Sequence, residues 1–200
     1  MAQEITRRSL PRFLSEHPTV VARKLLGCYI VRTFDDGSEA VVRIVETESY
    51  DQTDEASHTF KGFSPRSATM FGPSGYWYVY FTYGMHFCCN IVSYDEGIGA
   101  GVLIRAVEPV LGEEILSMNR GDKTGPVLTN GPAKLCQALG INLDFNGHNA
   151  KREPLRLVEG DEVHDDDVVQ TTRIGISKAK DELRRFYVDS SPYVSVRVAR

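Results

Sequence analysis

Residues 28–50 read CYIVRTFDDGSEAVVRIVETESY, and this stretch decides the class of fold. Two runs rich in β-branched and apolar side chains, residues 28–34 and 38–50, flank the sequence Asp35-Asp36-Gly37. The glycine can adopt the positive φ that a tight hairpin turn needs. The sequence therefore predicts a β-hairpin whose second strand is long.

Two helices are predicted on either side of the strand-rich middle of the chain. The first covers residues 18–26, with Pro18 in its first turn and Gly27 at its end. The second lies within residues 129–140 (TNGPAKLCQALG), where Gly131-Pro132 opens the helix and Gly140 closes it.

Further strands are predicted from runs of aromatic and β-branched residues. Residues 75–82 and 85–93 form a second hairpin that is unusually aromatic. Shorter strands are expected over residues 101–109, 155–158, 172–177 and 194–198. The class is therefore α+β. We expect one compact domain over residues 1–200, with a curved, mostly antiparallel sheet, a protruding β-hairpin and flanking helices.

Composition excludes several classes of protein. Of 200 residues, 42% are hydrophobic and 25% charged, which suits a globular chain with one sizeable core. No apolar run reaches the length of a membrane span, and the first residues lack the apolar block of a secretory signal. We expect a soluble, cytoplasmic protein with no membrane partner, acting as a monomer.

The cysteines and histidines show no spacing typical of a metal site. The four cysteines contain no C-x-x-C motif, and the five histidines are scattered along the chain. We therefore expect no disulfide, no metal and no cofactor. The residues concerned are Cys28, Cys88, Cys89, Cys136, His17, His58, His86, His148 and His164.

The formal net charge of −4 argues mildly against a partner rich in phosphate. The acidic residues cluster, however, and the C-terminal segment is basic, so a basic face on an acidic protein is compatible with the sequence. The basic residues of that segment are Arg173, Lys178, Lys180, Arg184, Arg185, Arg197 and Arg200.

The motif RIVETESY, residues 43–50, carries the first candidate chemistry. Strand alternation places Glu46, Glu48 and Tyr50 on one face. Most glutamates on strands are simply solvated, but the apolar neighbours here indicate burial. A carboxylate in a partly apolar cleft can act as a general base toward water near neutral pH. The residues alone do not choose between Glu46 and Glu48.

The aromatic hairpin carries a second candidate. Tyr83 directly precedes Gly84 at the predicted turn, where a large side chain would protrude. A side chain at the tip of a β-ribbon can wedge between base steps and fill the gap left by an extruded nucleotide, a role that suits Tyr83 with Met85. Tyrosines at 76, 78 and 80 alternate with three residues that we expect to pack in the core: Trp77, Val79 and Phe81.

Several motifs together closely resemble the 3-methyladenine (alkyladenine) DNA glycosylase family. They follow one another in family order from about residue 25 to residue 196. The resemblance is carried by RIVETESY, DEASH (54–58), MFGPSGYWYVYFTYGMHFCCNIVS (70–93), VLIRAVEP, NGPAKLCQALGI, RFYV and SPYVSV.

The resemblance implies roles for residues near the predicted cavity. Glu48, the second glutamate of ETE-x-Y, is implied as the general base, and Arg105 as a residue that positions the attacking water. Tyr50, His58 and Tyr80 are implied as walls around a flipped base.

Two further roles come from the same resemblance. Asn90 would oppose the exocyclic amino group of undamaged guanine. The backbone carbonyl of Ile174 would help to hold the water. Without the resemblance, Arg105 reads equally well as a strand-end arginine paired with Glu108.

The implied function is base-excision repair on double-stranded DNA that contains damaged purines. The enzyme would flip out 3-methyladenine or 7-methylguanine, and possible further lesions are hypoxanthine and ethenoadenine. It would hydrolyse the N-glycosidic bond without cleaving the strand.

Two other classes of function are compatible with the same residues. One is a glycoside hydrolase that uses Glu46 and Glu48 as its carboxylate pair. The other is a nucleic-acid-binding module in which the aromatic hairpin grips its partner without catalysis.

Overall fold

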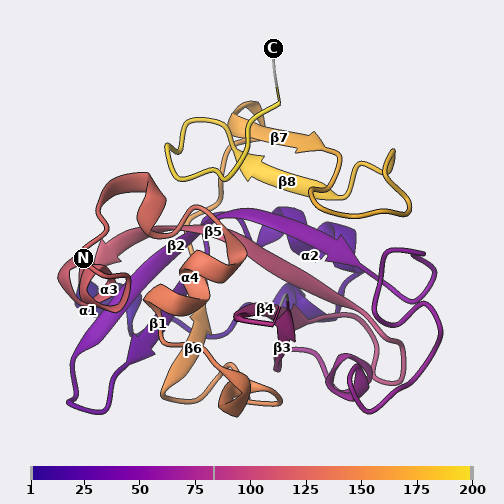
Figure 1. Cartoon of the computed structure of the whole chain (residues 1–200), viewed down its shortest axis with the longest axis horizontal. Coiled ribbons are helices and arrows are strands. Elements are labelled where there is room, and N and C mark those ends of the chain that lie inside the picture. Colours follow the sequence, from indigo (N-terminus) through magenta and orange to yellow (C-terminus); the bar gives the residue numbers. More distant parts are fainter. Residues whose placement is uncertain (1, 83, 199–200) are drawn as a thin grey trace.

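An eight-stranded antiparallel sheet forms the centre of the computed structural model, which describes residues 2–82 and 84–198 (Figure 1). Six strands follow one another in the order β3-β4-β5-β2-β1-β6, while β8 pairs with β2 and β7 pairs with β8. The strands are β1 (Tyr29–Thr33), β2 (Glu39–Tyr50), β3 (Trp77–Thr82), β4 (His86–Val92), β5 (Gly101–Leu111), β6 (Leu155–Val158), β7 (Val168–Thr171) and β8 (Arg185–Val188).

Strand β2 is the spine of the sheet. One of its edges pairs with β5, whereas the other pairs first with β1, through residues 39–43, and then with β8, through residues 46–48. The register with β5 shifts on both sides of Glu46, at the point where β2 changes partner. Such bulges bend a strand and redirect its side chains. The predicted hairpin of residues 28–50 is confirmed, and Gly37 has the expected positive φ of 81°.

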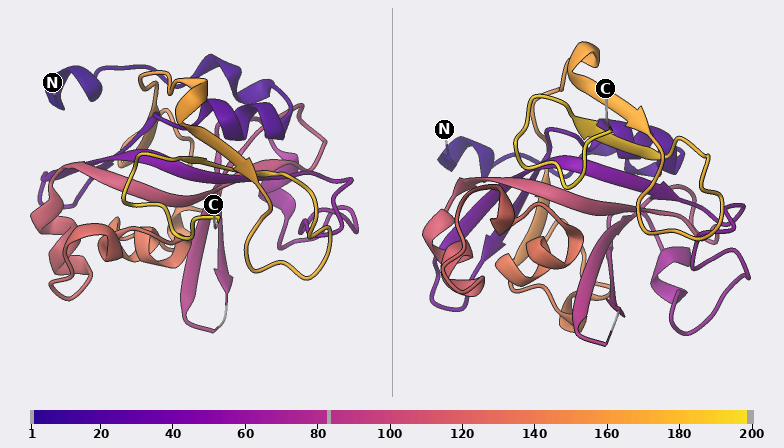
Figure 2. Two further views of the ribbon diagram at one scale, coloured as in Figure 1. Left: turned by 90° about the horizontal axis from the view of Figure 1, so that it is seen from above. Right: turned by 45° about the horizontal axis from the view of Figure 1, so that its top comes forward.

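Helices α2 (Pro18–Lys24) and α4 (Pro132–Ala138) cover opposite faces of this sheet, as the left view of Figure 2 shows. Both were predicted, and both begin with a proline in the first turn. The other helices are α1 (Ala2–Ile5), α3 (Glu113–Asn119) and 3-10 turns at Arg12–Ser15, Ala68–Phe71, Gly125–Leu128, Leu143–Phe145 and Asp165–Asp167. The α+β class is therefore confirmed.

The hairpin of β3 and β4 projects from the sheet on the side of α4 (Figure 2). Trp77 and Val79, near its base, are buried as predicted. Phe81 was expected in the core, but it is 45% exposed and packs against Phe87, with the ring centroids 5.3 Å apart. The reason is its position, because the hairpin has left the body of the protein by that point.

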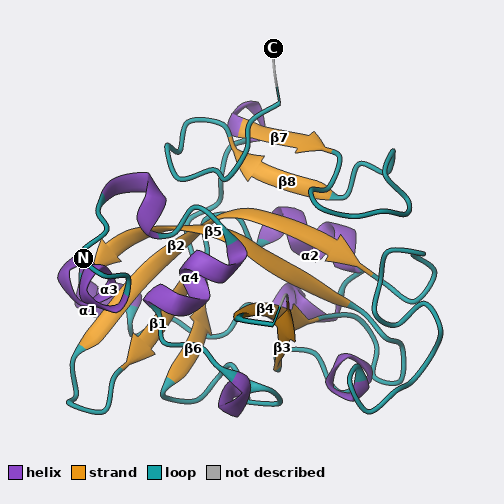
Figure 3. Cartoon of the chain, in the orientation of Figure 1, coloured by secondary structure: helices purple, strands orange, loops and turns teal. Residues whose placement is uncertain are grey.

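Two predicted strands are wrong. Residues 172–177 form a loop (Figure 3), in which the backbone N–H of Ile174 donates to Glu48 of β2 and the carbonyl of Thr172 accepts from the Arg185 side chain of β8. Residues 194–198 are likewise irregular, and the backbone N–H of Ser195 donates to Glu46. Strands β7 and β8 and helix α3 were not predicted. Within the described ranges, every helix is too short or too polar to cross a membrane.

A close backbone crossing joins the end of α2 to the segment after β6. A Cβ added at Gly160 would lie 1.7 Å from the carbonyl oxygen of Gly27, which is backbone and cannot move aside easily. Glycine is required at this crossing because only hydrogen fits there.

We expect Gly160→Ala to lower the free energy of unfolding by about 3 kcal/mol, since the overpacked crossing must separate. Thermal denaturation checks this as a lower Tm. Gly131→Ala is the matched control, because a Cβ there meets only the Lys134 side chain, at 3.5 Å or more. Equal melting of the two variants would contradict the argument.

Candidate active site

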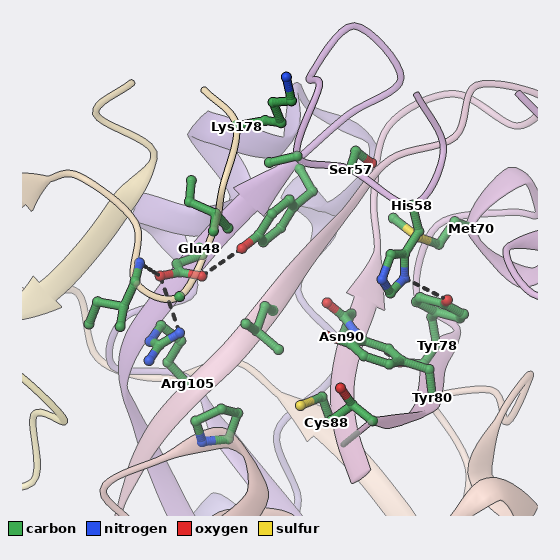
Figure 4. A pocket seen from close by; sticks show the side chains of 18 of the residues that line it. Glu48, Ser57, His58, Met70, Tyr78, Tyr80, Cys88, Asn90, Arg105 and Lys178 are labelled. Atoms are coloured by element: carbon green, nitrogen blue, oxygen red, sulfur yellow. Dashed lines mark hydrogen bonds and ion pairs between the residues drawn. The ribbon is translucent and has the colours of Figure 1, made fainter. Parts of the chain in front are cut away.

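A cavity of about 450 Å³ lies where β2, β3, β4 and β5 meet two loops, residues 55–58 and 174–178. Its size is within the range of small-ligand sites. The structure brings seven of the sequence-predicted site residues into its lining: Glu48, Tyr50, His58, Tyr80, Asn90, Arg105 and Ile174. Figure 4 shows Glu48 and Arg105 on one side of the cavity and His58, Tyr78 and Tyr80 on the other.

Glu48 is fully buried on β2 and receives three donors. The backbone N–H of Ile174 donates to Oε1 at 2.8 Å, and the Tyr50 hydroxyl donates to Oε2 at 2.7 Å. Arg105 Nη1 lies 3.3 Å from Oε1. Hydrogen bonds to a charged acceptor are strong, so this carboxylate is held in one orientation at the cavity wall.

Tyr50 has an unusual position between two charges. Burial, and then the neighbouring Glu48 carboxylate, raise the pKa of the phenol far above its ordinary value. The phenol therefore keeps its proton and acts as a donor to Glu48. One face of its ring is covered by the guanidinium of Arg173, whose central carbon lies 4.6 Å from the ring centroid.

Arg105 connects the two glutamates of β2. Its Nε lies 3.3 Å from Glu46 Oε1, and its Nη1 lies at the same distance from Glu48. Burial alone lowers the pKa of Arg105, but the carboxylates of Glu48 and Glu46 raise it above its ordinary value. The alternative pairing of Arg105 with Glu108 is wrong, because Glu108 instead lies 4.0 Å from Arg43.

Glu46 is also fully buried, but it is not among the residues that line the cavity. Its carboxylate accepts the backbone N–H of Ser195 at 2.7 Å, the Ser195 hydroxyl at 2.9 Å and Arg185 Nη1 at 2.6 Å. With Arg105 added, this carboxylate has four protein donors. The two glutamates differ in position, although strand alternation gave them one face: both are bonded to protein donors, but only Glu48 lines the cavity.

The opposite wall of the cavity is aromatic. The rings of His58 and Tyr80 meet edge to face, with centroids 4.6 Å apart, and His58 Nδ1 lies 3.0 Å from the Tyr78 hydroxyl. Burial raises the pKa of Tyr78 and Tyr80, and it raises the pKa of Cys88 to about 11. These three groups therefore remain protonated at neutral pH and place no negative charge on this wall.

Asn90 lies on β4, two residues after Cys88. Its Nδ2 donates to the backbone carbonyl of Tyr78 at 3.1 Å, and its side chain is directed toward the cavity in Figure 4. This bond uses one of the two N–H donors of the amide, so the second N–H and Oδ1 are left for contact with a ligand.

Met85, predicted to help fill the DNA stack, lies beyond β3 at the turn of the hairpin, is 70% exposed and is not in the cavity lining. Tyr83, predicted to intercalate, lies outside the described residues. Sequence reasoning missed Tyr78 and Cys88 as lining residues, although their two-residue spacing from Tyr80 and Asn90 was a usable signal.

Part of the predicted basic C-terminal face is used inside the protein. Arg173 and Arg185 are buried and paired with Asp54 and Glu46. Lys178 is exposed at the rim of the cavity and extends away from Glu48 (Figure 4). Among the residues that the structure describes, no group of three His, Cys, Asp or Glu side chains could hold a metal ion.

Comparison with known proteins assigns the chain to a class, the DNA glycosylases, which are hydrolases of base-excision repair. A family model described as methylpurine-DNA glycosylase (MPG) matches residues 12–192. The chain belongs to this family.

Two curated relatives agree with this assignment. A protein of Carboxydothermus hydrogenoformans is 47% identical over 188 residues, covering 93% of this chain and 98% of the relative. One of Methanoculleus marisnigri is 44% identical over 193 residues, covering 94% and 100%. Both carry the name "Putative 3-methyladenine DNA glycosylase".

His58 gives the site a pH dependence. Its surface is exposed toward the cavity, yet the surrounding protein, with the positive charge of Arg66, lowers its pKa below the ordinary 6.5. The folded protein therefore binds this proton less readily than the unfolded chain does. The contribution of His58 to the free energy of unfolding is therefore fully present above pH 6.5. It is lost as the pH falls from 6.5 through the lower pKa of the folded state.

We expect the free energy of unfolding to decrease more for the wild type than for His58→Gln when the pH falls from about 7.5 to about 5.5. Urea denaturation at the two values measures the difference. If the wild type loses no more stability than the variant, the lowered pKa of His58 is refuted.

Proposed function

We propose that this protein removes damaged, above all alkylated, purines from double-stranded DNA by hydrolysing their bond to the sugar. The observation that carries the proposal is Glu48: a buried carboxylate, fixed by three donors, on the wall of an aromatic cavity. Family membership supplies the class of reaction, and the geometry suits one nucleobase turned out of a duplex.

The proposed binding step uses the aromatic wall. Alkylation at ring nitrogens leaves many purines positively charged, and aromatic faces attract desolvated cations by roughly 2 kcal/mol. Tyr50, His58 and Tyr80 would surround the extruded base, while Asn90 would exclude undamaged guanine. At the hairpin tip, Tyr83 and Met85 would fill the space that the base leaves in the stack.

In the proposed hydrolysis, a water lies between Glu48, Arg105 and the backbone carbonyl of Ile174. The water oxygen bonds to the anomeric carbon, its proton passes to Glu48, and the bond electrons leave with the base. The negative charge of Glu48 also stabilises the positive charge that develops on the sugar. A cationic base leaves as a neutral molecule, whereas a neutral base such as hypoxanthine needs a proton.

The position of Glu46 disfavours a glycoside hydrolase. That reaction needs two carboxylates facing the same substrate, and Glu46 does not line the cavity that Glu48 lines. A binding module without catalysis predicts instead that no base is released at all.

Glu48→Gln should lower the single-turnover rate of 7-methylguanine release by about 100-fold to 10,000-fold, since the general base is lost while its shape is kept. Binding to the lesion duplex should persist in a gel-shift assay. Glu55→Gln is the control, because Glu55 lines the same cavity but is exposed. Equal activity in wild type and Glu48→Gln would exclude the mechanism.

We also expect release of the base without cleavage of the strand. Lyase chemistry needs a lysine that attacks the anomeric carbon, and Lys178 extends away from Glu48 at the rim. Borohydride trapping should yield no covalent protein–DNA adduct, and strand breaks should form only after alkaline treatment. A trapped adduct that disappears in Lys178→Met would overturn this expectation.

A further inference from the structure

A buried ion pair lies directly behind the cavity wall, between Arg173 and Asp54. Both side chains are completely inaccessible to solvent. Arg173 Nη2 donates to Asp54 Oδ1 at 2.9 Å, and Nη1 donates to the other carboxylate oxygen. Neither residue is in the cavity lining, so the pair can act on a ligand only through its neighbours.

Those neighbours are three segments of the cavity wall. The Arg173 guanidinium covers one face of Tyr50 and also donates to the backbone carbonyl of Ser49 at 3.0 Å. Residue 174 follows directly and donates its N–H to Glu48, while Asp54 precedes the loop of residues 55–58. One ion pair thus joins Tyr50 to both loops of the cavity.

The charge of this pair matters because Tyr50 has two faces. A ring attracts cations on either face, but two cations on opposite faces repel each other through it. Here the cation behind the ring is neutralised by Asp54. The neighbouring cation, Arg184, is paired as well: it lies 2.5 Å from Asp51 and 3.9 Å from Asp54, and it also contacts Glu182. On the cavity side, Glu48 faces Arg105.

We propose that the Asp54–Arg173 pair sets the preference of the cavity for positively charged over neutral purines, acting through Tyr50. Asp54 cancels the positive charge of Arg173, which would otherwise repel a cationic base from the face of the Tyr50 ring that lines the cavity. Arg173 holds the ring and the loop of Ile174 in place. Both are positioning residues in this inference, which rests on the proposed function and specifies its substrate class.

The test compares one cationic and one neutral lesion, 7-methylguanine and hypoxanthine, in duplexes of the same sequence. The dependence of the single-turnover rate on protein concentration gives an apparent Kd for each lesion, and the ratio of the two affinities is the cationic-to-neutral ratio of each variant. Affinities are compared because hypoxanthine takes up a proton before it leaves, so only its binding reports a neutral base. In Asp54→Asn an uncompensated guanidinium remains roughly 8 to 10 Å from the lesion charge. We expect that ratio to fall roughly 15-fold to 30-fold relative to wild type, at an effective dielectric constant near 20.

Three further variants separate charge from structure. Arg173→Met removes the cation and keeps the Asp54 anion, so the ratio should rise. The double variant Asp54→Asn, Arg173→Met has no charge at either position, so its ratio should return toward the wild-type value although both rates are reduced. Arg173→Lys keeps the charge and loses the two-pronged contact, so its ratio should stay near that of the wild type.

If the pair acts only by supporting the structure, each of the four variants affects the cationic and the neutral lesion equally, and the cationic-to-neutral ratio stays at the wild-type value. This result would overturn the inference. Circular dichroism melts establish that each variant is folded. If Asp54→Asn does not fold, equal ratios for Arg173→Met and Arg173→Lys overturn it equally well. A wild type that releases neither lesion refutes the proposed function itself, which is a different outcome.

Discussion

The rest of the structure depends on the burial of two carboxylates on one strand. Glu46 and Glu48 are both fully buried, and unpaired charges in such positions are strongly destabilising. Arg105, which contacts both, supplies one positive charge for two negative ones. Arg185 supplies the second, and backbone N–H groups complete the shell. Ile174 and Ser195 are therefore held over β2 by bonds to these buried carboxylates, whereas β8, which lies between them in the sequence, is held by strand pairing.

This arrangement gives the two glutamates different positions. Glu46 is covered by the C-terminal segment, which supplies the backbone N–H and the hydroxyl of Ser195, and it does not line the cavity. Glu48 lies two residues further along β2, where β8 ends its pairing and the cavity begins. Glu46 still acts on Glu48 indirectly, because it shares Arg105 and so prevents the guanidinium from pairing with Glu48 alone.

Local patterns in the sequence predicted the hairpins and the helices α2 and α4, since turn glycines and prolines act over a few residues. They could not predict contacts between distant segments: Asp54 and Arg173 are 119 positions apart, and Glu46 and Ser195 are 149 apart. For the same reason, residues 172–177 and 194–198 were wrongly predicted as strands. Apolar and polar residues alternate in both segments, as they do in strands, but the backbones of these segments bond to buried side chains.

The same limit applies to the site. Burial of ETE-x-Y followed from its apolar neighbours, yet the choice of Glu48 came from family resemblance, because no local signal reports which donors surround each carboxylate. The basic residues near the C-terminus illustrate the converse error. Counted along the sequence they suggest a surface for phosphate, whereas Arg173 and Arg185 are internal counterions of Asp54 and Glu46. In this chain the formal charge of a segment says little about its surface, and contact with DNA has to rest on the exposed cations that remain, such as Lys178 at the cavity rim.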